Sequence, residues 1–148
     1  MSRQPLNEPI LAYAPGSTER DMIKVELERQ MNEVIEIPCI INGEKIFTGI
    51  TINQVIPHNH KHILAKVHLA TEKEIKAACK SAVESQKDWI ELGLEGRCAI
   101  FEKCAELLAG DWRMKVNAAT MLNQSKTVYQ AEIDAACELI DFWRFNCH

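Results

Sequence analysis

The 148-residue sequence has no long apolar run, no basic cluster and no pair of cysteines spaced as Cys-x-x-C. No apolar stretch approaches the roughly 20 residues that a membrane-spanning helix needs. The 17 Lys and Arg residues are scattered among 21 acidic residues, and the net charge is −4. This distribution lacks the basic stripe that binds nucleic acid or an anionic membrane surface. We therefore expect neither nucleic acid nor a membrane as a partner.

The N-terminal stretch MSRQPLNEPILAYAPG lacks the charged start and apolar block of a secretory signal. It is also too poor in basic residues for a mitochondrial transit peptide. Of the six cysteines, Cys79, Cys98, Cys104 and Cys137 fall at apolar positions of helical patterns. We interpret them as small core residues in a reducing compartment, and no cysteine has sequence neighbours that would activate a nucleophile.

Glycine is sparse as well, with six residues in the chain. They stand apart from one another, so none of them builds the glycine-rich turn that holds a dinucleotide phosphate at the start of a helix. The sequence therefore predicts no cofactor-binding residues in this chain.

What is present predicts a mixed α/β fold dominated by helices. Residues 1–16 are expected to form an extended arm, followed by a helix over 17–36. Thr18 and Asp21 have the spacing of a capping box, and apolar residues recur with helical period. These residues are Ile23, Leu27, Met31 and Val34. We expect the helix to end near Glu36, before Pro38.

Residues 38–70 are predicted to form strands. Asn42-Gly43 lies between two β-rich runs and indicates a hairpin, because both residues accept the positive φ of a type I′ turn. Two further extended runs follow, ITINQVI and ILAKVHLA. The segment PHNHKH between them is expected to be a polar turn, through which strand alternation does not continue.

That turn contains His58, His60 and His62, which are two residues apart. On a strand, such residues point to one face and could together bind a metal ion. Acidic residues that could orient the imidazoles are sparse nearby. A histidine-rich metal-binding protein is therefore an alternative hypothesis, and the principal prediction assigns no metal ligand.

Residues 71–148 are predicted to form four helices. Thr71 and Glu74 make a capping box, and the next helix follows a break at LGLEG and is closed by Gly110 in the left-handed conformation. Asp111 is expected to cap the third helix, and Thr127 with Gln130 to cap the fourth. Apolar faces are expected at Ile75, Ala78, Cys79, Ala82, Val83 and Trp89; at Phe101, Cys104, Ala105 and Leu108; at Trp112, Val116 and Ala119; and at Ile133, Ala136, Cys137, Ile140 and Trp143.

The second half of the chain resembles the N-terminal region of the aldehyde dehydrogenase superfamily. The resemblance lies in the strand and capped helix that ends in Trp, in GRCAIFEKCAELLAG and in SKTVYQAEIDAACELIDFWRFN. The stretches NEPILAYAPGSTERD, IPCIINGEKIFT and QAEIDAACELIDFWRFN are similar to the subgroup of 1-pyrroline-5-carboxylate dehydrogenases. The resemblance extends from about Asn7 to Asn146. It implies that residues 17–148 are the N-terminal segment of an aldehyde dehydrogenase domain, truncated at its C-terminus.

The resemblance implies an NAD-dependent oxidoreductase of proline degradation. Its members oxidise L-glutamate 5-semialdehyde to glutamate in the mitochondrial matrix, using a cysteine nucleophile, and are expected to be homo-oligomers. In this superfamily the nucleophile and the NAD-binding residues lie downstream of the segment represented by the chain. We therefore expect no catalytic residue here and no activity of the chain alone. A non-catalytic interaction or oligomerisation module is the other alternative.

One site residue is implied by the resemblance. Glu138, in AACELIDF, matches an acidic residue that borders the semialdehyde pocket, where a carboxylate would face the substrate's amino group. Alternatively, Glu138 is a solvated acid beside the apolar face of the helix. The chain also departs from the superfamily in NQSKT, where Asn123 and Ser125 replace the glycines that usually flank the lysine. Glycine tolerates positive φ at little cost, so this turn is expected to differ.

Overall fold

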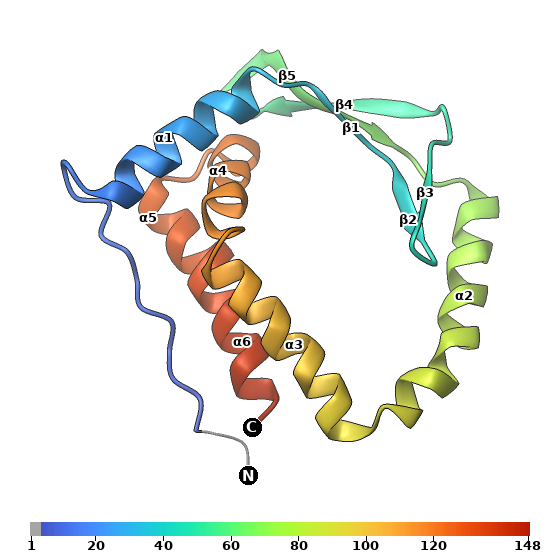
Figure 1. Ribbon diagram of the computed structural model, residues 1–148. Helices are drawn as coiled ribbons and strands as arrows, with labels where there is room; N and C mark the ends of the chain where they lie inside the picture. Colours follow the sequence, from blue (N-terminus) through green and yellow to red (C-terminus); the bar gives the residue numbers. More distant parts are fainter. Residues whose placement is uncertain (1–3) are drawn as a thin grey trace.

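The computed structural model describes residues 4–148 and has the predicted mixed architecture, with helices dominant (Figure 1). A three-stranded sheet joins α1 on one side to α2 on the other, α4 packs against α1, and α3 lies beside α6. The elements are α1 (Thr18–Met31), β1 (Ile35–Ile37), β2 (Cys39–Ile41), β3 (Glu44–Ile46), β4 (Thr51–Ile56), β5 (Asn59–His68), α2 (Glu72–Glu91), α3 (Gly93–Ala109), α4 (Arg113–Gln124), α5 (Val128–Ala131), the π-helix η1 (Glu132–Cys137) and α6 (Glu138–Asn146).

Helix α1 is capped and terminated differently from the prediction. Its N-cap is Ser17, whose hydroxyl accepts a hydrogen bond from the Arg20 N–H, so the predicted capping box of Thr18 and Asp21 is wrong. The helix ends at Met31 and not near Glu36. The reason is non-local, because Ile35–Ile37 pairs in parallel with β5 and is drawn into the sheet.

The predicted hairpin at Asn42-Gly43 is confirmed. Strands β2 and β3 pair antiparallel, and the two turn residues have φ values of 51° and 76°, as a type I′ turn requires. In the three-stranded sheet the order is β1-β5-β4. Strand β5 begins at Asn59, directly opposite Ile56, so the turn is limited to Pro57-His58. Strand β5 thus includes Asn59–His62, which the prediction placed in the turn. The register shifts there, since Ile56 is opposite Asn59 and Val55 is opposite Ile63, so the prediction that regular strand alternation does not continue through PHNHKH is confirmed.

Helix α2 has the predicted capping box of Thr71 and Glu74. Its apolar face, however, is not covered by the rest of the described chain. Ile75 and Val83 are 56% and 72% exposed, and Cys79 is exposed as well, so its predicted core position is wrong. Because α2 packs mainly against β2 and α3, its apolar face has no layer opposite it.

Both ends of α3 differ from the prediction. The helix begins at Gly93, where φ is +67°, so the break that separates it from α2 is short. Gly110 closes α3 with φ −101° and ψ −114°, which is not left-handed. The N-cap of α4 is Trp112, with no side-chain cap, so the predicted cap at Asp111 is wrong. The Arg113 N–H bonds to the Gly110 carbonyl, which turns the chain tightly into α4.

The core lies where α1, α4, the α5–η1–α6 segment and the sheet meet. Ala136, Cys137 and Ile140 are buried as predicted for the last helical stripe, and the Thr127–Gln130 capping box is confirmed. Helix α4 instead buries a face that contains Arg113, Asn117, Ala118 and Leu122, whereas the predicted core residue Trp112 is 51% exposed. The π-helix η1 was not predicted, because its single extra residue per turn leaves no clear mark in an apolar pattern.

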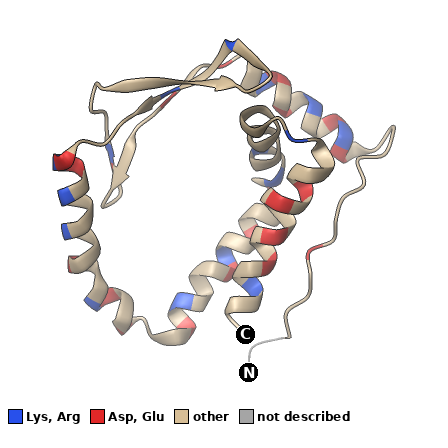
Figure 2. Ribbon diagram, turned by 180° about the vertical axis from the view of Figure 1, so that it is seen from behind, with Lys and Arg blue, Asp and Glu red and all other residues tan. Residues whose placement is uncertain are grey.

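Residues of both charges are interspersed along α1 and α2 (Figure 2). On α2 they form ion pairs one turn apart, between Lys76 and Glu72 and between Lys87 and Glu91. Within residues 4–148, no helix combines the length and the hydropathy that crossing a bilayer requires.

Candidate functional site

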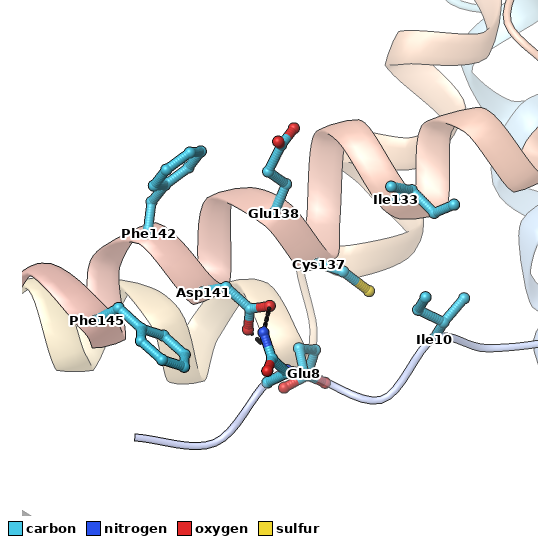
Figure 3. Close-up of a pocket in the computed structure, with 9 residues that line it drawn as sticks. Glu8, Ile10, Ile133, Cys137, Glu138, Asp141, Phe142 and Phe145 are labelled. Atoms are coloured by element: carbon cyan, nitrogen blue, oxygen red, sulfur yellow. Dashed lines mark hydrogen bonds between the residues drawn. The ribbon is translucent and has the colours of Figure 1, made fainter. Parts of the chain in front are cut away.

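A pocket of about 520 Å³ lies between the N-terminal arm and the η1–α6 segment (Figure 3). The arm covers one side of the pocket and the helical segment forms the other. The lining residues are Asn7, Glu8, Ile10, Ile133, Cys137, Glu138, Asp141, Phe142 and Phe145. The pocket therefore has an apolar wall with carboxylates at its edge.

The arm is held in place by its backbone and by two acidic residues. Asp141 accepts hydrogen bonds of 2.7 Å from the Asn7 side-chain amide and from the Glu8 backbone N–H. The Glu8 carboxylate accepts from Arg113 at 2.6 Å and from Arg144 at 2.8 Å. Because these bonds join residues more than 100 positions apart, the pocket exists only when the arm is docked.

Beneath the arm lies a buried polar network centred on Glu132, which is fully buried. Its carboxylate accepts from the Leu11 N–H at 2.8 Å, from the Tyr13 hydroxyl at 2.8 Å and from the Asn117 amide at 2.8 Å. It also forms an ion pair with Arg113, whose guanidinium donates to the Pro9 carbonyl. A buried carboxylate with this many donors is satisfied and stays ionised.

The electrostatics of the network follow from burial and pairing. Burial opposes ionisation of Glu132, but the hydrogen bonds from Arg113, Leu11 and Tyr13 outweigh it and lower the pKa of the carboxyl group. Burial likewise opposes the charge on Arg113, yet hydrogen bonds to Glu132 and Glu8 raise its pKa. Burial and the neighbouring carboxylate both raise the pKa of Tyr13. All three groups therefore keep their ordinary charge states at neutral pH.

Glu138 lies at the first residue of α6 and is exposed. It points away from the arm, on the same side of the helix as Phe142 one turn later, whereas Cys137 and Asp141 point toward the arm (Figure 3). Within the described chain Glu138 has no hydrogen bond or ion pair with another side chain, so its carboxylate is available to a ligand.

Cys137 lines the same pocket but lacks the setting of a nucleophile. Burial and the negative charge of Glu132 raise the pKa of its thiol to about 11. Its sulfur contacts the Glu132 carboxylate at 3.7 Å and the Pro9 carbonyl at 3.8 Å. The Arg113 guanidinium donates to the sulfur at 3.3 Å and favours the thiolate, but burial and Glu132 outweigh it. Cys137 therefore acts here as a packing residue.

The three alternating histidines do not converge. The His58 ring bonds to the Ser125 hydroxyl at 2.7 Å, and the His62 ring bonds to the Met31 carbonyl at 2.9 Å. His60 is exposed on β5. Among residues 4–148, no group of three or more His, Cys, Asp or Glu side chains has an arrangement that could hold a metal ion.

Sequence reasoning missed the residues on which the pocket depends. Tyr13, Arg113, Asn117 and Glu132 are polar residues in segments that look solvated, and no local spacing marks them as partners. One signal was available: Arg113 and Asn117 are one helical turn apart, so both can face the same neighbour. Only the folded chain shows that this neighbour is a buried carboxylate.

Comparison with known proteins gives consistent matches. The family described as "Aldehyde dehydrogenase family" matches residues 48–148. A mitochondrial delta-1-pyrroline-5-carboxylate dehydrogenase of Dictyostelium discoideum is 45% identical over 142 residues, which is 96% of this chain and 25% of that protein. The human mitochondrial enzyme of that name is 42% identical over 140 residues, again 25% of its length. The chain thus spans about a quarter of the curated relatives it matches.

Solved structures with a similar backbone come from enzymes of the same name. A delta-pyrroline-5-carboxylate dehydrogenase from Mycobacterium tuberculosis bound with NAD is 46% identical, with a TM-score of 0.95 over 99% of this chain and 28% of that one. A 1-pyrroline-5-carboxylate dehydrogenase variant from Thermus thermophilus is 26% identical, with a TM-score of 0.90 over 99% of this chain and 28% of that one. The described backbone therefore matches the N-terminal part of these enzymes.

Proposed function

The chain belongs to the aldehyde dehydrogenase family, and from this membership we propose that it forms the N-terminal part of an NAD-dependent dehydrogenase that oxidises L-glutamate 5-semialdehyde to glutamate. The observation that carries the proposal is the agreement of nearly the whole chain, in sequence and in backbone, with enzymes of that name. Several of these relatives are mitochondrial by name, which supports a matrix location. The reaction belongs to proline degradation.

The catalytic groups are proposed to lie outside these 148 residues. The chemistry needs a cysteine thiolate that attacks the aldehyde, donors for the developing oxyanion, and NAD to accept the hydride. The raised pKa of Cys137 supports the assignment of the nucleophile to another part of the enzyme. The role of this chain is then to buttress the cofactor-binding domain and to supply one wall of the substrate pocket.

Glu138 is proposed as the substrate-binding residue of this segment. Its free carboxylate could pair with the ammonium group of the semialdehyde, and it stands beside the exposed ring of Phe142. A charged hydrogen bond of this kind contributes about 1.5–3 kcal/mol, or roughly 10- to 100-fold in affinity. The structural anchors Glu8 and Asp141 are occupied by the arm and are not assigned to the substrate.

Two assays test the proposal. The purified chain, given NAD and glutamate semialdehyde, is expected to form no NADH above background, and turnover would contradict the assignment of the nucleophile elsewhere. A chimera in which this chain replaces the matching quarter of the Mycobacterium tuberculosis relative is expected to oxidise the semialdehyde. An inactive but folded chimera would argue against the proposed function.

In the active chimera, Glu138→Gln is expected to raise KM for the semialdehyde roughly 10- to 100-fold. It should leave KM for an aldehyde without an amino group unchanged. Glu106→Gln, which removes an exposed acid of α3, is the matched control and should change neither constant. An equal change for both aldehydes in Glu138→Gln would show that this residue is not an ammonium partner.

A further inference from the structure

Two cysteines from distant parts of the chain contact each other where α3 begins and α6 ends. The Cys98 sulfur lies 3.8 Å from the Cys147 carbonyl oxygen, and the Cys147 sulfur lies 3.8 Å from the Cys98 carbonyl oxygen. This reciprocal arrangement places each sulfur against the backbone of the other cysteine.

We propose that Cys98 and Cys147 form a dithiol modification site, at which a low-molecular-weight disulfide such as oxidised glutathione closes a reversible disulfide between α3 and the end of α6. The site is independent of the proposed dehydrogenase function. Both cysteines are free and half-buried, so a small oxidant reaches them while the surrounding helices hold them together.

The chemistry proceeds in two exchange steps. The Cys98 thiolate attacks one sulfur of oxidised glutathione, whose S–S bond breaks and releases one glutathione thiolate. The Cys147 thiolate then attacks the Cys98 sulfur of the mixed disulfide and releases the second glutathione. The two protons lost by the cysteines pass through solvent to the two glutathione thiolates. Two protein thiols are oxidised, and one glutathione disulfide is reduced to two thiols.

The environment of Cys147 sets the order and the pH dependence of these steps. Burial, followed by its hydrogen bond to Cys98, raises the pKa of Cys147 to about 11. At neutral pH Cys147 is therefore a poor first attacker of a free disulfide, but it can resolve a mixed disulfide that is already in contact with it. The rate of ring closure should rise as the pH rises toward 11.

Closure should stabilise the chain, because the two cysteines are 49 positions apart and the bond restricts the unfolded state. We expect Tm to rise by roughly 5–15 °C. A reducing agent should reverse the shift. The bond would also fix the C-terminal end of α6 against α3, on the helix that carries Glu138 and Phe142.

The test uses the reduced 148-residue chain, incubated with oxidised glutathione at mildly alkaline pH, alkylated and digested with trypsin. Trypsin cuts after Arg97, Lys103 and Arg144, so closure yields the peptide CAIFEK linked to FNCH. The intact mass should fall by about 2 Da, from the loss of two hydrogens. The same treatment in urea should give mixed pairings, so a single linked peptide in native buffer reports the folded contact.

Cys147→Ser should keep a glutathione adduct on Cys98, Cys98→Ser should form little adduct on Cys147, and neither variant should form the linked peptide. Cys79→Ser removes an exposed bystander on α2 and should close as the unsubstituted chain does. Glutathione on both Cys98 and Cys147 without a linked peptide would overturn the proposal, as would a disulfide-linked dimer as the main product.

Discussion

At the scale of single residues, the stability of the chain should depend on the ionisation of Glu132. Because its folded pKa is lowered, its contribution is present above the unfolded pKa, near 4.5, and is lost as the pH falls through the folded value. We therefore expect the free energy of unfolding to fall as the pH drops below about 4.5, measured by urea denaturation followed by circular dichroism. The physical cause is loss of the Arg113 ion pair when the carboxylate is protonated.

Glu132→Gln separates this contribution from that of other acids. It should destabilise the chain by about 3–5 kcal/mol at neutral pH, because Arg113 loses one of its buried partners. It should also flatten the acid limb of the pH profile. Asp134→Asn, which removes a half-exposed acid paired with Lys126, is the matched control and should cost under about 1 kcal/mol. An unchanged acid limb in Glu132→Gln would contradict the assignment.

At the scale of elements, the turn after α4 keeps its shape at an energetic cost. Ser125 caps this helix with φ 54°, in the left-handed region that favours glycine. Ser125 adopts this conformation without being a glycine, and its hydroxyl bonds to the His58 ring at 2.7 Å.

A pair of substitutions measures that cost. Ser125→Gly and Ser125→Ala both remove the hydroxyl, but only glycine relieves the backbone. We expect the glycine variant to be more stable than the alanine variant by about 1 kcal/mol, measured by urea denaturation. Equal stabilities would mean that the turn changes its conformation when the His58 contact is lost.

Elements that are defined by local interactions could be predicted from the sequence, whereas those defined by distant pairing could not. The hairpin at Asn42-Gly43 and the capping boxes at Thr71 and Thr127 were predictable, because each depends on residues within four positions. The end of α1 was not, because β1 is defined by its pairing with β5.

The candidate site could likewise be predicted only in part. Glu138 was found through resemblance, and its role stays a prediction. The network of Arg113 and Glu132 could not be found, because a sequence does not show which polar residues are buried.

At the scale of the whole molecule, large apolar side chains remain uncovered. Val83 on α2 is 72% exposed, Leu94 on α3 is 68% exposed and Phe142 on α6 is 57% exposed. The chain covers 28% of the Mycobacterium tuberculosis relative, so most of that relative lies outside the matched part, which supports the idea that these faces are interfaces. Exposed apolar surface drives association in water.

We therefore expect the isolated chain to self-associate with increasing concentration, as measured by light scattering. The double variant Val83→Glu and Leu94→Glu should reduce association, whereas Lys80→Glu with Lys87→Glu, which changes charge but not apolar surface on α2, should reduce it less. A monodisperse monomer at high micromolar concentration would refute this expectation and would favour a self-contained protein.

The π-helix η1 has a consequence for how this segment can vary. The π-turn Glu132–Cys137 holds one residue more than an α-helical turn would. Loss of one residue from it would therefore convert the turn into a regular α-helix and leave Ile140 on the buried face of α6. The same deletion inside α6 would instead turn every later side chain by about 100°. Among the positions of this segment, η1 is therefore the place where the length of the chain can change by one residue without rotating the helix that follows.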